Sequence, residues 1–206
     1  MMKKRLAILL SGRGSNFVAI ADAVERGDLD AEIAVVISNR AGAAGIKLAR
    51  GRGLTAVELP PQRKMKREDY DELLIAELAK YDVDLIILAG FMRILSNKFV
   101  RKFPQKILNI HPSLLPAFPG LDVHQVSLDW GVKVSGCTVH FVDEGLDSGP
   151  IVKQATVPVL DDDTAETLAA RILKEEHKIY TEAIKVVLSG NFQIEGRRVI
   201  ETPDAE

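Results

Sequence analysis

Residues 109–116 read Asn-Ile-His-Pro-Ser-Leu-Leu-Pro, and two of them have side chains suited to acyl-transfer chemistry. The segment follows the apolar pair Ile107-Leu108 and meets a proline, which is typical of the end of a buried strand. Because strand side chains alternate between faces, Asn109 and His111 are expected to point the same way. An amide donor beside a titratable imidazole can hold a carbonyl oxygen while it becomes an oxyanion. The alternative is a turn with a capping asparagine and a structural histidine.

A carboxylate that could serve this imidazole lies in the glycine-rich stretch 143–150, Asp-Glu-Gly-Leu-Asp-Ser-Gly-Pro. Asp147 could favour the charged form of His111 and position a water molecule. The alternative is an aspartate that shapes its own turn. His140 lies in an apolar strand just before this stretch and is interpreted as a core histidine.

The turn after the first expected strand, Ser-Gly-Arg-Gly-Ser-Asn at residues 11–16, has glycines that let the backbone approach an anion. It lacks the Gly-Lys-Ser/Thr of a P-loop. It also has Phe17 where a dinucleotide fingerprint has its third glycine. The turn therefore predicts a site for a single phosphate monoester, with Ser15 and Asn16 as additional donors. A tight turn with Ser15 as the helix N-cap is the alternative.

Two further segments could bind a ligand. The apolar loop Ala89–Leu95 follows a central strand at its carboxyl end, where open α/β sheets bind ligands. It could wall a pocket for a flat ring, or it could pack on the next helix. The segment 62–67 is basic; it is either a solvated loop or a place where Arg67 meets a ligand carboxylate.

Short apolar runs alternate with amphipathic stretches along the chain. Strands are expected at residues 5–10, 33–37, 55–59, 83–88 and 107–111, and helices at 16–26, 45–52 and 67–80. This alternation predicts an α/β fold with an open, mostly parallel, Rossmann-like sheet and helices on both faces. The β-rich stretches 133–142 and 151–159 should pair as an antiparallel edge near residues 133–159. A helix is expected from 165 to about 188, capped by the acidic stretch 161–164. We predict one domain over residues 1–190 and a short polar tail over 191–206.

The composition is that of a soluble globular protein, with 206 residues, 47% hydrophobic and 27% charged. The net charge of −2 gives no electrostatic reason to expect nucleic acid or an anionic membrane as a partner. The single cysteine, Cys137, excludes an internal disulfide, and no cluster has metal-ligand spacing. The apolar run 6–10 is too short for a signal peptide, and no segment has transmembrane length. A cytoplasmic monomer or homodimer is expected.

Four motifs in this order, at residues 11–16, 88–95, 109–116 and 140–150, resemble the folate-dependent phosphoribosylglycinamide formyltransferases. The resemblance covers residues 5 to about 190. It implies transfer of a formyl group from 10-formyltetrahydrofolate, as co-substrate, to the amine of 5-phosphoribosylglycinamide in purine biosynthesis, without a metal. It also implies that the N-terminal half binds the nucleotide phosphate and the C-terminal half the folate.

By this resemblance the catalytic residues are Asn109, His111 and Asp147. The ribonucleotide would contact Gly14, Ser15, Asn16, Leu173, Lys174, Glu175 and Glu176. Arg67 would reach the glutamate tail of the folate, and the rest of the folate site would be Met92, Arg93, Ile94, Leu95, Asn109, Asp143, Glu144, Gly145, Leu146 and Asp147. Asp122 and Arg13 stand where some members of the family carry histidine and a smaller polar residue, and neither is given a role.

The same catalytic core occurs in methionyl-tRNA formyltransferases and formyltetrahydrofolate hydrolases. The tRNA enzymes carry an extra C-terminal domain and a basic face, whereas this chain is slightly acidic and ends sooner. The hydrolases carry an extra N-terminal domain and need no phosphate loop for an acceptor. A hydrolase, or another formyltransferase with this core, is the alternative function. A non-catalytic folate-binding module would fit only if His111 or Asp147 were absent.

Overall fold

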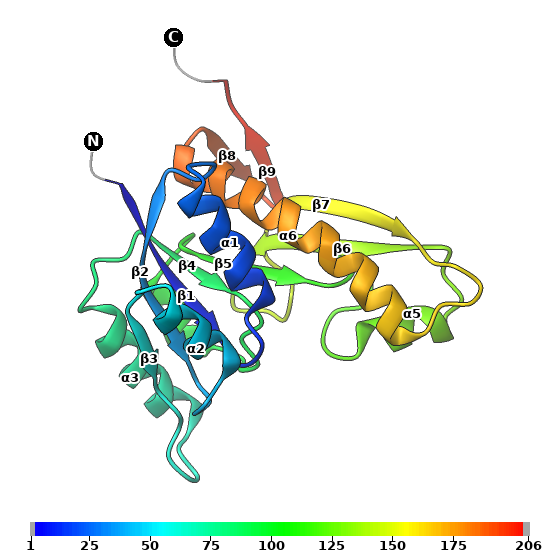
Figure 1. Ribbon diagram of the computed structural model, residues 1–206. Coiled ribbons are helices and arrows are strands. Elements are labelled where there is room, and N and C mark those ends of the chain that lie inside the picture. Colours follow the sequence, from blue (N-terminus) through cyan, green and yellow to red (C-terminus); the bar gives the residue numbers. More distant parts are fainter. Residues whose placement is uncertain (1–2, 204–206) are drawn as a thin grey trace. The chain divides into compact units, whose positions relative to one another are not determined.

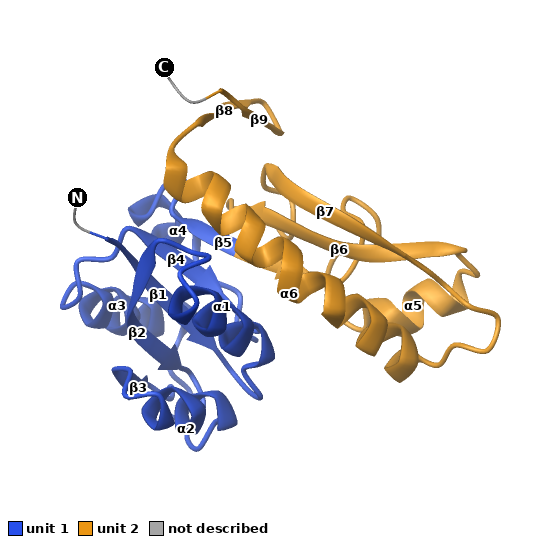
Figure 2. Cartoon of the chain, turned by 45° about the horizontal axis from the view of Figure 1, so that its top comes forward, with its two compact units in different colours: residues 1–108 blue, residues 109–206 orange. Residues whose placement is uncertain are grey.

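The computed structural model describes residues 3–203. The chain divides into two compact units, Met1–Leu108 and Asn109–Glu206 (Figure 2). This boundary falls inside the single domain predicted over residues 1–190, whose extent stays a prediction. No helix in the described part of the chain combines the length and the apolar character that crossing a membrane requires.

The first unit is built on parallel strands in the order β3-β2-β1-β4 (Figure 1). The strands are β1 (Lys4–Leu10), β2 (Ala31–Ser38), β3 (Ala56–Glu58) and β4 (Leu85–Leu88). The helices are α1 (Ser15–Glu25), α2 (Ala44–Gly51), α3 (Arg67–Leu78) and α4 (Asn97–Lys102). Right-handed crossovers place α1 and α2 on one face, and α3 and α4, which contact each other, on the other. Since both faces are covered, residues 6–10 of β1 form a continuous apolar run with no exposed surface.

The second unit contains an antiparallel pair and one long helix. Its elements are β5 (Ile107–His111), which spans the boundary, α5 (Val123–Asp129), β6 (Val134–Phe141), β7 (Ile151–Pro158), α6 (Ala165–Ser189), β8 (Phe192–Glu195) and β9 (Arg198–Glu201). β6 and β7 pair antiparallel, and β9 joins β7 in parallel. The helix α6 packs along β6 and β7. A capping box formed by Thr164 and Thr167 begins α6, and Gly190 in the left-handed region ends it.

The predicted fold class is confirmed, since the first four strands are parallel and the two stretches within residues 133–159 pair antiparallel; β9 and β8 lie outside this pair, at the edge of the sheet. Two short helices, α4 and α5, were not predicted, because six or seven residues are too few to show a helical period. The predicted polar tail contains the hairpin β8–β9. Its two-residue turn begins at Gly196, whose φ is 62°. The ring of Phe192 stacks on Phe141 at 5.8 Å, a tertiary contact that no local pattern reveals.

Candidate active site

The three side chains predicted to be catalytic lie in one cluster of the second unit. Oδ2 of Asp147 is 3.5 Å from Nδ1 of His111. Oδ1 of the same carboxylate is 3.8 Å from Nε2 of His140. Nδ2 of Asn109 is 3.2 Å from that same nitrogen of His140. A carboxamide, two imidazoles and a carboxylate are therefore gathered at the carboxyl end of β5 and the end of β6.

His111 has an oxygen opposite each of its ring nitrogens. Nδ1 faces Asp147, and Nε2 is 2.8 Å from the backbone carbonyl oxygen of Phe118. Because a carbonyl oxygen can only accept, Nε2 carries a proton in this arrangement. A ring with a proton on each nitrogen pairs with both oxygens. The two oxygens thus suit a ring that donates through both nitrogens, and Phe118 accepts from Nε2 in this structure.

Asp147 does not shape its own turn, so this alternative interpretation is wrong. Its Oδ2 accepts from the backbone N–H of Gly120, at 2.9 Å and 27 residues away in the chain. Asp143 shapes the turn instead, because its Oδ1 accepts from the N–H of Gly145 and the hydroxyl of Ser148. Asp147 has a φ of 49°, a left-handed conformation that aspartate tolerates better than most residues.

The second histidine of the cluster, His140, is 2% exposed. Burial is the largest effect on its pKa, which lies below the ordinary value. The hydrogen bond to the Phe141 carbonyl and the charges of Asp147 and Asp143 act in the opposite direction, and His111 acts with burial. His140 is therefore held in its neutral form.

The predicted phosphate loop lies between β1 and α1 in the first unit. Gly14 is the N-cap of α1 with a φ of 80°, and the helix begins at Ser15 without a side-chain cap. The alternative with Ser15 as the N-cap is therefore wrong. Ser11 fixes the start of the loop: its hydroxyl donates to Oδ1 of Asn39 at 2.5 Å and accepts from the N–H of Met92 at 2.7 Å. The phosphate loop is thus tied to the loop that follows β4.

Replacing Gly14 by alanine should destabilise this loop, whereas the same change at Gly12 should not. A Cβ on Gly14 would lie 2.8 Å from the Cα of Gly45, and its φ is positive; a Cβ on Gly12 meets nothing within 4 Å. The backbone at Gly14 or at Gly45 would have to move to relieve this clash. Gly14→Ala should therefore lower the melting temperature by roughly 5–10 °C. Thermal unfolding of both variants tests this, and equal melting temperatures for the two would contradict it.

The loop predicted to hold the pterin divides its side chains between solvent and protein. Met92 and Ile94 are each 59% exposed, whereas Leu95 is buried. The guanidinium of Arg93 lies over the ring of Tyr70, 4.3 Å from its centroid. Two apolar side chains are therefore free to meet a ligand while their neighbours anchor the loop.

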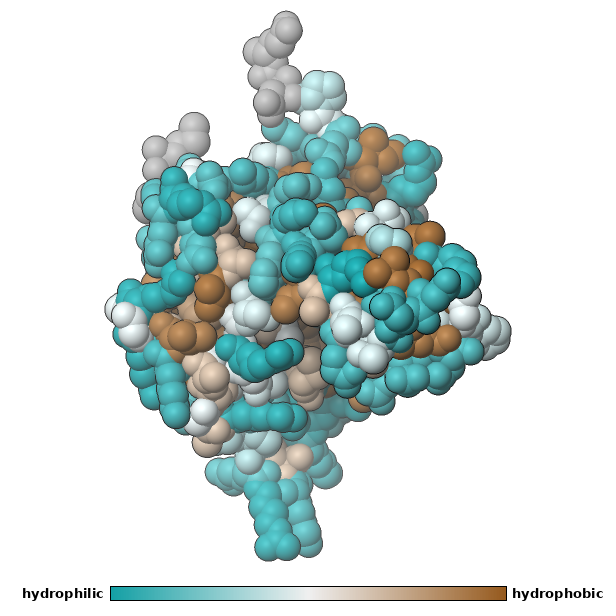
Figure 3. Space-filling model, turned by 45° about the vertical axis from the view of Figure 1, so that its right-hand side comes forward, coloured by the Kyte–Doolittle hydropathy of each residue, from teal (hydrophilic) through white to brown (hydrophobic). Residues whose placement is uncertain are grey.

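Hydrophobic residues on the face shown in Figure 3 lie as separate spots among hydrophilic ones.

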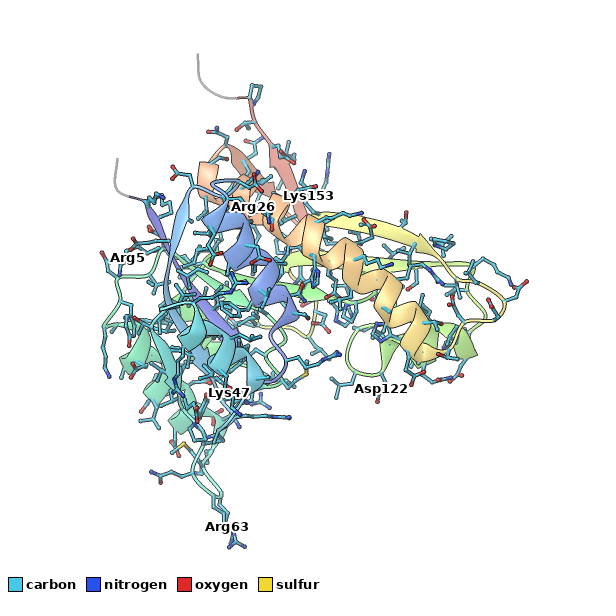
Figure 4. All side chains as sticks on the ribbon, viewed as in Figure 1. Arg5, Arg26, Lys47, Arg63, Asp122 and Lys153 are labelled. Carbon is cyan, nitrogen blue, oxygen red and sulfur yellow. The ribbon has the colours of Figure 1, made fainter. Side chains whose placement is uncertain are left out.

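Arg67 is exposed at the first position of α3, where the basic segment 62–67 ends. The segment forms a loop whose tip carries Arg63, which points away from the strands of the first unit (Figure 4). The cationic side chain expected to meet a carboxylate is thus accessible from solvent.

The four residues predicted on α6 for the ribonucleotide point in different directions. Consecutive helical residues are rotated by about 100°, so Leu173, Lys174, Glu175 and Glu176 cannot all face one ligand. Glu176 is buried and Lys174 is exposed. Burial first, and then the charges of Glu176 and Glu175, raise the pKa of the Cys137 thiol on β6 to about 12. The charges of both glutamates act on Cys137, so this effect does not distinguish them, and the assignment of all four residues to the ribonucleotide stays a prediction.

Sequence analysis missed three contributors to the cluster: His140, the carbonyl of Phe118 and the N–H of Gly120. The signal for His140 was its place near the end of the strand that leads into the loop of Asp147. The two backbone groups of the 117–121 loop leave no signal in residue type. Across residues 3–203, no group of three or more His, Cys, Asp or Glu side chains is arranged to hold a metal ion.

The chain is similar in sequence to known formyl transferases. The family model described as formyl transferase matches residues 4–184. The human trifunctional purine biosynthetic protein adenosine-3 is 44% identical over 192 residues, which are 93% of this chain; the chain spans only 19% of that protein's length. Phosphoribosylglycinamide formyltransferase from Escherichia coli is 41% identical over 189 residues, covering 92% of this chain and 89% of the relative.

The crystal structure of glycinamide ribonucleotide transformylase 1 from Symbiobacterium toebii superimposes with a TM-score of 0.95. It is 49% identical and covers 98% of this chain and 95% of its own. The resemblance drawn from the four motifs is confirmed, and the chain belongs to the formyl transferase family.

Proposed function

We propose that the protein transfers the formyl group of 10-formyltetrahydrofolate to the amine of 5-phosphoribosylglycinamide. The products are formylglycinamide ribonucleotide and tetrahydrofolate, and the reaction belongs to de novo purine biosynthesis. The observation that carries the proposal is the contact of Asp147 with His111, in one cluster with Asn109. The names of the relatives from E. coli and S. toebii support the identity of the acceptor.

Acyl transfer at this cluster begins with the uncharged amine attacking the formyl carbon. A nitrogen–carbon bond forms, and the formyl oxygen gains negative charge. An N–H of Asn109 and the charged Nε2–H of His111 then donate to that oxygen. For this step the carbonyl of Phe118, which accepts from Nε2 in the structure, gives way to the oxyanion.

The remaining chemistry is proton transfer and departure of the folate. Asp147 orients the His111 ring through Nδ1 and, with a bound water, relays the proton from the attacking amine to the folate nitrogen. The bond between the formyl carbon and that nitrogen breaks as the nitrogen accepts the proton. Nothing is oxidised or reduced.

The substrates are assigned to the predicted binding residues. Gly14, Ser15 and Asn16 would hold the phosphate of the ribonucleotide, because they lie at the N-terminus of α1, which favours an anion and has no side-chain cap. Glu176 would contact the glycinamide or ribose part.

The folate would occupy the loops 92–95 and 143–147, largely through backbone groups, with the exposed Met92 and Ile94 against the pterin. Arg67 would meet the glutamate carboxylate of the tail. The assignment thus uses apolar surface for the flat ring and an exposed cation for the acidic end of the same molecule.

Acceptor dependence tests the proposal. Loss of 10-formyltetrahydrofolate is followed with the ribonucleotide, with its dephosphorylated riboside, and with no acceptor. We expect turnover that requires an acceptor and a KM much higher for the riboside, because the riboside has no phosphate to bind at the N-terminus of α1. Consumption of the formyl donor at full rate without any acceptor would identify a hydrolase instead.

A further inference from the structure

We propose that His140 is a positioning residue. It fixes the orientation of the Asn109 carboxamide by accepting one N–H of its nitrogen, so that the second N–H can donate to the reacting carbonyl. The inference rests on the proposed function, because it concerns the donor to the formyl oxygen. It starts from two contacts of one buried ring: Nδ1 lies 2.8 Å from the Phe141 carbonyl oxygen, and Nε2 lies 3.2 Å from Nδ2 of Asn109.

The first contact fixes where the proton of His140 sits. The Phe141 carbonyl can only accept, so Nδ1 must carry a proton. The ring is neutral, since its pKa is lowered chiefly by burial. Nε2 is then a bare lone pair. A neutral ring anchored in this way presents an acceptor, and only an acceptor, to its neighbour on β5.

The second contact fixes the amide of Asn109. Its nitrogen has two N–H bonds, and one of them donates to Nε2 of His140. Turning the amide over would set the Asn109 oxygen against the lone pair of Nε2, two acceptors facing each other. The favoured orientation therefore keeps the nitrogen toward His140 and leaves its second N–H to donate elsewhere. A free asparagine would present its oxygen as often as its nitrogen.

The fold around His140 is built to hold this ring. The register between β6 and β7 shifts by one residue between Val139 and His140, an irregularity that re-aims a strand side chain. Phe141, whose carbonyl accepts from Nδ1, is itself fixed in place, because its N–H donates to the carbonyl of Pro150 at 2.9 Å. A Cβ on Gly149 would lie 1.9 Å from that anchoring oxygen, so only glycine leaves room for it.

Two substitutions separate the anchor from the acceptor. The side-chain amide of asparagine reaches the place of Nδ1, so His140→Asn keeps a donor to Phe141 and loses the acceptor for Asn109. Glutamine reaches the place of Nε2, so His140→Gln restores an acceptor. We expect His140→Asn to lower kcat by roughly 10- to 100-fold with KM for both substrates little changed, and His140→Gln to recover most of it.

A double-mutant cycle distinguishes positioning from a general structural role. In the Asn109→Ala background there is no amide to orient, so His140→Asn should lower kcat by less than about threefold further. An equal fold-loss in both backgrounds would overturn the proposal, as would wild-type kcat in His140→Asn. Absence of formyl transfer by the wild-type protein would instead refute the proposed function.

A measurement on the unaltered protein guards against variants that fail to fold. Nitrogen-15 NMR of the histidine rings reports which nitrogen carries the proton. The expected result at neutral pH is a neutral His140 protonated on Nδ1. A ring protonated on Nε2 would face the Asn109 amide with a donor and would refute the proposal without any substitution.

Discussion

His111→Ala is expected to lower kcat by roughly 100- to 1000-fold, the usual cost of removing one donor to an oxyanion. The imidazole faces the Asp147 carboxylate through Nδ1, at 3.5 Å, and in the proposed reaction its Nε2–H is a donor to the formyl oxygen. Alanine leaves Asp147 with the Gly120 N–H as partner, so the loop retains one of its anchors. Steady-state kinetics with both substrates gives the loss.

Binding of the ribonucleotide should survive this substitution. The residues assigned to its phosphate belong to the first turn of α1, and His111 is not among them. Calorimetric titration of the ribonucleotide into wild type and His111→Ala should therefore give similar affinities. A kcat within a few-fold of wild type would remove the oxyanion role from His111. A joint loss of binding and thermal stability would mean that the ring is mainly structural.

Asp147→Asn should lower kcat by roughly 100- to 10,000-fold, the range of general acid–base contributions. Asparagine keeps an oxygen for the Gly120 N–H and tolerates the left-handed backbone, so the loop should persist. It cannot balance an imidazolium or relay a proton as a carboxylate does. The comparison of kcat with that of wild type under saturating substrates isolates the loss of charge.

Asp122 offers a matched control for this change. It is an aspartate of the same unit with a similar positive φ of 55°, it is exposed, and it lies on the loop before α5 (Figure 4). Asp122→Asn removes the same charge from the same backbone conformation and should leave kcat within roughly twofold of wild type. Similar losses in both variants would show that net charge, rather than the contact with His111, explains the effect of Asp147→Asn.

The elements that position the cluster could be predicted because their signals are local. β5 was predicted with the bounds it has, since an apolar run that ends at a proline is short and unambiguous. Strand alternation then placed Asn109 and His111 on one face. α5 and the hairpin β8–β9 could not be predicted, because the former is too short for a period and the latter is held by the contact of Phe192 with Phe141.

The partners of the side chains proposed to be catalytic could not be predicted from the sequence, for a different reason. Phe118 and Gly120 contribute through backbone atoms, which every residue possesses. His140 was interpreted as a core histidine, and it is buried as expected, yet its Nε2 meets Asn109. A histidine can be buried and still contact a functional side chain, and the sequence alone does not show which buried histidines do so.

The carbonyl of Phe118 has a consequence for selectivity between reaction stages. A neutral formyl oxygen is no better acceptor for the Nε2–H of His111 than the Phe118 carbonyl oxygen that already accepts from it. The unreacted formyl-folate therefore gains little by displacing the Phe118 oxygen. The negatively charged oxygen of the tetrahedral species is a far stronger acceptor. In the proposed reaction, the Phe118 oxygen would therefore be displaced from Nε2–H only by an acceptor stronger than an amide oxygen, which is what the formyl oxygen becomes when it gains negative charge.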